Sequence, residues 1–144
     1  MSVEFSLQEE PRSEAFDVPI QQGTVLILEN IYYDFDAFSI QEGAAKELDE
    51  LATVMQQYAS MQIELIAHTD SRGTTIYNLE LSQKRAQSAK QYLIEKGISH
   101  DRIQTFGFGE SKIRNHCSEG INCAEEEHAF NRRTEVRITK IDAP

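Results

Sequence analysis

Residues 61–97 have the sequence MQIELIAHTDSRGTTIYNLELSQKRAQSAKQYLIEKG, which predicts a strand, a turn and a helix in direct succession. MQIELIAH alternates apolar and polar residues, as is typical of a strand with one buried face. TDSRGTT has the composition of a turn, and the helical spacing of residues 77–96 ends at Gly97, a common helix stop. A strand followed by so long a helix favours a right-handed crossover and therefore some parallel strand pairing.

The segments on either side predict three further strands and a second helix. TVLILENIYYDF (residues 24–35), DRIQTFGFGE (101–110) and the alternating RRTEVRITKI (132–141) are expected to be strands, and apolar spacing predicts a helix over 41–58. The expected fold class is α+β: a β-α-β-α-β-(short α)-β sandwich with a mixed sheet. Charged residues alternate with apolar ones in the last strand, so the helices are expected to pack on one face and solvent to cover the other.

Length favours one ordinary domain, and the composition is acidic. The chain has 144 residues and a formal net charge of −10, which disfavours nucleic acid and anionic membranes as partners. It has no apolar run of about 18 residues and no signal peptide, so it is either cytosolic or a fragment of a longer exported protein. Residues 1–22 are expected to be a lead-in or linker with a candidate extra edge strand, and residues 23–144 the domain.

Two cysteines, Cys117 and Cys123, lie six residues apart in the polar stretch NHCSEGINCAEEEH. The spacing leaves three interpretations open. A metal site would need further ligands; His116 and His128 flank the pair, but no CxxC spacing is present. Two free thiols would suit a cytosolic protein, whereas a disulfide around the small loop, which fits best, implies an oxidising compartment.

Three polar residues of the predicted second helix fall inside its apolar stripe. At about 100° per residue, Asn78, Ser82 and Arg85 lie among the apolar positions rather than on the charged face. Asp70, at the end of the preceding strand, can approach Arg85. The two charges either form a buried ion pair that holds the loop, or bind a zwitterion, with Arg85 taking its carboxylate and Asp70 its ammonium.

The segment HTDSRGTTIYNLELSQKRAQSAKQYLIEKG closely resembles the signature of the OmpA-like peptidoglycan-binding domain (OmpA C-terminal, Pal or MotB type). Three further motifs of that family occur in the expected order: YYDFD after the first strand, FGFGES after the third and NRRTEV at the last. The resemblance covers about residues 24–141. The cysteine loop resembles the version found in Bacteroidetes-type outer-membrane proteins.

The resemblance implies non-covalent binding of peptidoglycan through the diaminopimelate of the stem peptide. Such binding would anchor an outer-membrane or periplasmic protein to the cell wall. The family's ligand residues match Asp70, Arg85, Asn78, Thr69, Asp36, and either Arg132 or Arg133. Strand alternation favours Arg132, because it shares the helix-facing side with Val136.

The implied location is the periplasmic side of the outer membrane of a Gram-negative bacterium, as a fragment of a longer exported protein. The implied partner is diaminopimelate-containing peptidoglycan, with other envelope proteins as candidate further partners and no direct membrane insertion. No cofactor or metal is expected. The alternative is a module of the same fold that binds another envelope protein and no ligand.

Enzymatic activity is not expected from this sequence. Asp34 and Asp36 share one strand face and could suggest an acid–base pair, but no nucleophile or metal triad accompanies them. A cell-wall hydrolase would need one or the other. A binding module is therefore the expected class.

Overall fold

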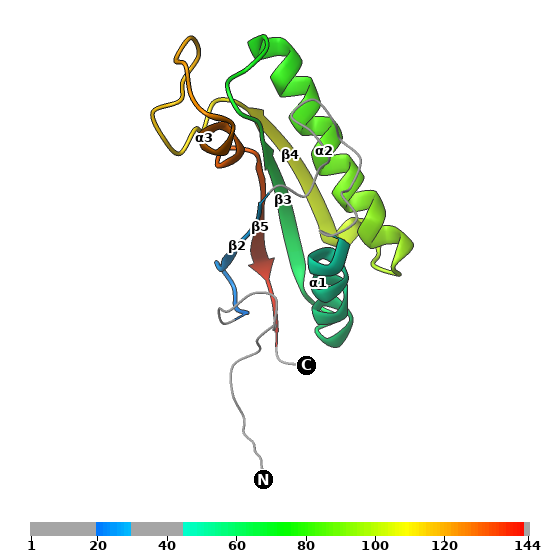
Figure 1. The fold of residues 1–144 in the computed structure, drawn as a ribbon. Coiled ribbons are helices and arrows are strands. Elements are labelled where there is room, and N and C mark those ends of the chain that lie inside the picture. Colours follow the sequence, from blue (N-terminus) through cyan, green and yellow to red (C-terminus); the bar gives the residue numbers. More distant parts are fainter. Residues whose placement is uncertain (1–19, 30–44, 143–144) are drawn as a thin grey trace.

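A computed structural model describes residues 20–29 and 45–142 of the chain (Figure 1). The described elements are β2 (Val25–Glu29), α1 (Ala45–Gln57), β3 (Gln62–His68), α2 (Thr75–Glu95), a 3-10 turn (His100–Arg102), β4 (Ile103–Gly109), α3 (Glu125–Ala129) and β5 (Arg133–Lys140). This order confirms the expected α+β succession, including the short helix before the last strand.

The strands form one four-stranded mixed sheet in the order β2-β5-β3-β4. β5 is antiparallel to both of its neighbours, with Val136 opposite Leu26 on β2 and Leu65 on β3. β3 and β4 are parallel, and α2 is the crossover between them. The parallel pairing expected from a strand followed by a long helix is therefore confirmed.

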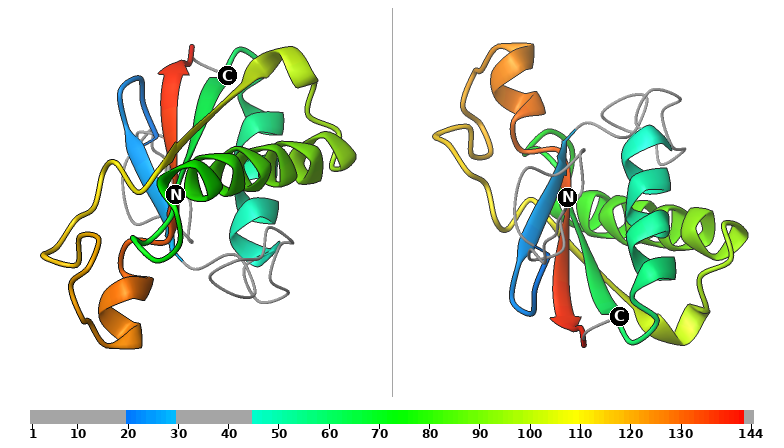
Figure 2. Two further views of the ribbon diagram at one scale, coloured as in Figure 1. Left: turned by 90° about the horizontal axis from the view of Figure 1, so that it is seen from above. Right: turned by 90° about the horizontal axis from the view of Figure 1, so that it is seen from below.

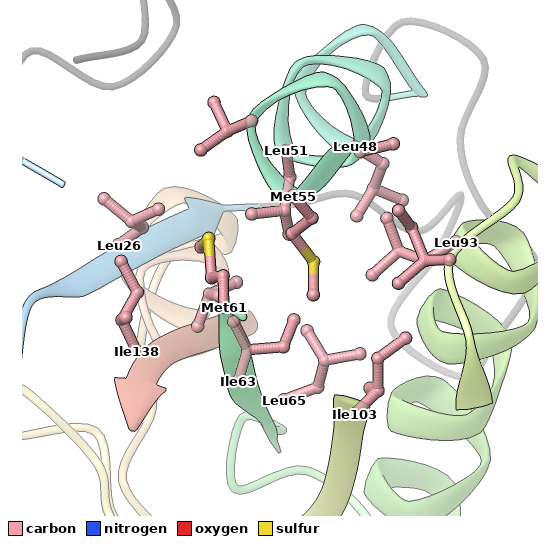
Figure 3. Close-up of a cluster of buried hydrophobic side chains, with 14 of the residues drawn as sticks. Leu26, Leu48, Leu51, Met55, Met61, Ile63, Leu65, Leu93, Ile103 and Ile138 are labelled. Carbon is pink, nitrogen blue, oxygen red and sulfur yellow. The ribbon is translucent and has the colours of Figure 1, made fainter. Parts of the chain in front are cut away.

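Both long helices lie on the same side of the sheet, and the hydrophobic core fills the space between (Figure 2). Figure 3 shows the apolar side chains of the sheet facing those of α1 and α2; the labelled ones are Leu26, Leu48, Leu51, Met55, Met61, Ile63, Leu65, Leu93, Ile103 and Ile138. The opposite face carries partly exposed apolar side chains, among them Val25, Ile27, Phe106 and Phe108. Helices on one face and an open second face agree with the expected sandwich.

Two of the predicted strands extend beyond the described residues. β2 accounts for the first part of the predicted strand 24–35, and the rest of that strand lies outside the description, as does the candidate edge strand within residues 1–19. Ile20, placed by sequence in the lead-in, is buried in the core. No helix in the described ranges is long and apolar enough to cross a membrane.

One end of the sheet brings together the segments that form the candidate site. β3 and β4 end there, β5 begins there, and α2 starts immediately after the turn that follows β3 (Figure 1). α2 packs very closely on β4: a Cβ atom added at Gly107 would lie 2.5 Å from the Gln83 nitrogen. The FGFG stretch therefore lets the helix approach the strand, which fixes the start of α2 above the strand ends.

Candidate functional site

The turn between β3 and α2 is held by hydrogen bonds on both sides. The Thr69 backbone N–H donates to the Gly109 carbonyl at 2.9 Å, and the Thr69 hydroxyl donates to the Asp70 carbonyl at 2.9 Å. The Asn78 side-chain amide, in the first turns of α2, donates to the Arg72 carbonyl at 2.9 Å. Strand, turn and helix are thus tied together around Asp70.

The Asp70 carboxylate accepts hydrogen bonds from two arginines. Its Oδ1 accepts from the Arg72 backbone N–H at 2.9 Å and from Arg72 Nε at 3.2 Å. Its Oδ2 accepts from an Arg72 terminal nitrogen and an Arg132 terminal nitrogen, each at 2.8 Å. Burial acts to raise the pKa of Asp70, but the hydrogen bonds from Arg72 and Arg132 outweigh it and lower that pKa below its usual value.

Glu125, the first residue of α3, bridges the same two arginines. Its Oε1 accepts from Arg72 at 3.0 Å and its Oε2 accepts from Arg132 at 2.7 Å. The hydrogen bond from Arg132 contributes most to lowering the pKa of Glu125. We call Asp70, Arg72, Glu125 and Arg132 the charge ring, because each carboxylate contacts both guanidinium groups.

The charge ring has a buried half and an exposed half. The Asp70 side chain is 2% exposed and that of Arg132 is 9% exposed. The Arg72 side chain is 31% exposed and that of Glu125 is 62% exposed. One oppositely charged pair therefore lies inside the protein and a second lies over it.

α2 carries buried polar side chains where the helical wheel predicted them. Asn78 is 2% exposed, and Ser82 and Arg85 are fully buried. The Ser82 hydroxyl accepts a hydrogen bond at 2.8 Å from the backbone N–H of Gly109, at the end of β4.

The buried ion pair expected as one alternative, between Asp70 and Arg85, is not the pairing that the described contacts show. Asp70 contacts Arg72 and Arg132 instead. The physical reason is local: the Arg72 backbone N–H bonds the carboxylate two residues earlier, which places the Arg72 side chain beside it. Arg132, the residue immediately before β5, donates to the same carboxylate.

Of the two arginines in the NRR motif, Arg132 is the one that contacts Asp70. Arg132, which the alternation favoured, belongs to the charge ring. Arg133 points away: its Nε donates to Glu135 at 2.9 Å and a terminal nitrogen donates to the Lys112 carbonyl at 2.9 Å. The structure therefore brings Arg132, and not Arg133, to Asp70.

The cysteine loop lies against the turn that carries Asp70. Cys117 and Cys123 form a disulfide, as the loop composition favoured. The Ser71 hydroxyl donates to the Cys117 carbonyl at 2.6 Å, which ties the loop to the turn. The two sulfurs and one potential metal-ligand atom each from His116 and Glu127 lie within 4.8 Å of one another. Sulfurs joined in a disulfide, however, are not thiolate ligands for a metal ion.

Sequence reasoning found part of this site and missed part of it. Asp36, predicted from the resemblance, lies outside the described residues. Arg72 was missed, although its position two residues after an aspartate in a turn is a typical spacing for a local hydrogen bond. Glu125 was also missed, because it lies far from Asp70 in sequence and no local pattern indicates their proximity.

A spacious groove in the described part of the chain lies elsewhere. It has a volume of about 810 Å³ and runs between α2 and β4, lined among others by Gln83, Gln87 and Phe106. None of the charge ring residues lines it. Because the groove contains no buried charge pair, the charge ring remains the candidate for binding a charged ligand.

Comparisons with known proteins agree with this architecture. The model of the OmpA family matches residues 32–126. The peptidoglycan-associated lipoprotein of Buchnera aphidicola is 38% identical over 106 residues, or 74% of this chain and 58% of that protein. Outer membrane porin F of Pseudomonas fluorescens is 35% identical over 109 residues, or 76% of this chain and 32% of the porin. The crystal structure of the peptidoglycan-associated lipoprotein from Burkholderia pseudomallei has a TM-score of 0.68 and 28% identity, covering 76% of this chain and 89% of that one.

These names describe lipoproteins and a porin rather than enzymes, and they agree with the envelope location expected from the sequence. The chain spans less than two thirds of the length of both curated relatives. The family model nevertheless covers more than half of the chain, and the four sequence motifs occur in the family order. This chain therefore belongs to the OmpA family.

Proposed function

We propose that this chain binds peptidoglycan non-covalently through the diaminopimelate of the stem peptide, and so anchors an outer-membrane or periplasmic protein to the cell wall. The observation that carries the proposal is the buried pair of Asp70 and Arg132, whose side chains meet at 2.8 Å at one end of the sheet. The free end of diaminopimelate has an ammonium and a carboxylate on one carbon atom. A neighbouring anion and cation in the protein are complementary to both charges.

Each predicted residue has a role in this proposal. Asp70 accepts from the ammonium, while Arg132 and Arg85 bind the carboxylate. Asn78 and Thr69 hold the turn that places Asp70, through the hydrogen bonds described above. The proposed role of Asp36 rests on the family resemblance alone.

The same chemistry predicts selectivity between stem peptides. A lysine-containing stem peptide has the ammonium but lacks the second carboxylate, so it leaves the arginines without their ligand group. A hydrogen bond to a charged group contributes about 1.5–3 kcal/mol. The lysine peptide is therefore expected to bind about 10- to 100-fold more weakly than the diaminopimelate peptide.

Calorimetric titration of the purified domain with the two peptides tests the proposal. Arg85→Lys keeps the charge but not the two-pronged geometry, and is expected to cut affinity for the diaminopimelate peptide at least about 10-fold. Lys84→Gln, on the exposed side of the same helix, is the matched control and should bind as wild type does. Melting curves separate lost binding from lost folding.

Sedimentation with purified sacculi tests the cell-wall claim directly. Wild-type protein is expected to pellet with diaminopimelate-type sacculi and to release no soluble muropeptide from them. Folded protein that stays in the supernatant would contradict the proposal and favour the envelope protein-interaction module. Reproducible release of muropeptides would contradict the binding-only function.

A further inference from the structure

The buried half of the charge ring is already occupied by charges of the chain itself. Arg72 places a guanidinium on Asp70, and Glu125 places a carboxylate on Arg132. We propose that the Arg72–Glu125 ion pair imitates the zwitterionic ligand, an inference that rests on the proposed function. The ion pair occupies the site in the unliganded domain, and the ligand displaces it on binding.

The geometry of this pair supports the comparison with a zwitterion. Arg72 and Glu125 contact each other at 3.0 Å, so a positive and a negative group lie side by side. The positive group faces the buried carboxylate at 2.8 Å, and the negative group faces the buried guanidinium at 2.7 Å. An ammonium and a carboxylate on one ligand carbon would present the same two charges in the same order.

Asp70 has little remaining capacity for a ligand while Arg72 stays in place. A carboxylate has about four lone-pair sites. In the structure four donors approach them: the backbone N–H and two side-chain nitrogens of Arg72, and one nitrogen of Arg132. A ligand ammonium must therefore replace donors that belong to the chain.

Exposure indicates which of these groups leaves. The Arg72 and Glu125 side chains are 31% and 62% exposed, whereas Asp70 and Arg132 are almost fully buried. Exposed ion pairs contribute little net stability because water competes for both charges. Displacing the outer pair is thus energetically accessible, while moving the inner pair would bury an unpaired charge.

The exchange makes Glu125 a competitor of the ligand carboxylate. Removing its charge releases one Arg132 nitrogen and the outer contact of Arg72, so the ligand no longer has to displace a carboxylate. Glu125→Gln is therefore expected to bind the diaminopimelate tripeptide about 1.5- to 5-fold more tightly than wild type, the range associated with exposed ion pairs.

Glu126→Gln is the matched control. It removes the same charge from the same helix, at the next residue, which is exposed. None of the described side-chain contacts joins Glu126 to Arg72 or Arg132. Long-range electrostatics would change both variants alike, whereas displacement changes Glu125→Gln alone. Equal or weaker peptide binding by Glu125→Gln, compared with wild type, would overturn the inference.

A second titration separates this inference from the proposed function. Sodium acetate is added to ¹⁵N-labelled protein against sodium chloride at equal ionic strength, and the Nε resonances of Arg72 and Arg132 are followed. We expect saturation at several-fold lower acetate in Glu125→Gln than in wild type or Glu126→Gln. Identical acetate responses would overturn the inference even where wild type binds the peptide. Wild type that binds no peptide contradicts the proposed function, and the acetate titration then decides by itself whether Glu125 is displaceable.

Discussion

Replacing Asp70 by asparagine is the substitution with the largest expected effect on stability. Asp70→Asn keeps the size of the side chain but removes the charge that faces Arg72 and Arg132. Hydrogen bonds to charged groups contribute about 1.5–3 kcal/mol each, and removing one partner of a buried ion pair costs about 3–5 kcal/mol. Three guanidinium nitrogens donate to Asp70, but Arg132 keeps its contact with Glu125, so we expect a loss of about 3 kcal/mol at pH 7.

Urea unfolding and thermal melting measure this loss. For a domain of this size a loss of 3 kcal/mol corresponds to a Tm lower by about 10 °C. The pH dependence gives a second check, because the pKa of Asp70 is lower in the folded than in the unfolded chain. The stability that Asp70 contributes is therefore fully present above the unfolded pKa of about 3.9, and is lost as pH falls through the folded pKa. The difference between wild type and Asp70→Asn should shrink in that acid range.

Asp101→Asn is the control, because that carboxylate is exposed and its removal should leave the free energy of unfolding nearly unchanged. Equal stability of wild type and Asp70→Asn at pH 7 would refute the reasoning from the charge ring. A stability difference that persists unchanged at acid pH would show that the loss does not come from the charge of Asp70.

Gly107→Ala is expected to lower the free energy of unfolding by about 1–3 kcal/mol in urea titrations, because the added Cβ would lie 2.5 Å from the Gln83 nitrogen; an unchanged midpoint would contradict this. Non-reducing mass spectrometry of natively purified protein should show Cys117 and Cys123 joined, and reduction should cost about 2 kcal/mol for so short a loop. Two free thiols would contradict that pairing. Burial, and after it the charge of Arg133, lower the pKa of His68 to about 4. Between pH 6.5 and 4 the unfolded chain therefore binds a proton that the folded chain does not bind. The free energy of unfolding falls as the pH drops through that window. His68→Gln should reduce this pH dependence, as measured by urea unfolding at several pH values.

Periodic features of the sequence predicted which polar side chains of a regular element are buried. The helical wheel placed Asn78, Ser82 and Arg85 on the buried side of α2, and the structure buries all three. Strand alternation favours Arg132 over Arg133, and Arg132 is the arginine that contacts Asp70, whereas Arg133 contacts Glu135. Both arguments need only the repeat of one element, which local sequence determines.

The pairing of charges could not be obtained in the same way. The sequence suggested Asp70 with Arg85, whereas the described contacts join Asp70 to Arg72 and Arg132. Which guanidinium reaches a carboxylate depends on the path of the turn and of the cysteine loop, and neither follows a repeat. Glu125 reaches the site because the loop that carries α3 packs against the turn through Ser71, a contact between segments that are distant in sequence.

The position of the site at one end of the sheet has a mechanical consequence. β5 begins beside the charge ring and runs eight residues, about 25 Å, to the end where Gly23 bonds Ile138. Tension between a ligand held at Asp70 and a tether joined near Ile20 would act along the strands. Such a load stretches the rows of inter-strand hydrogen bonds in shear, so that many must break together instead of one after another. A pull between these two points would thus be resisted by the strands of the sheet together.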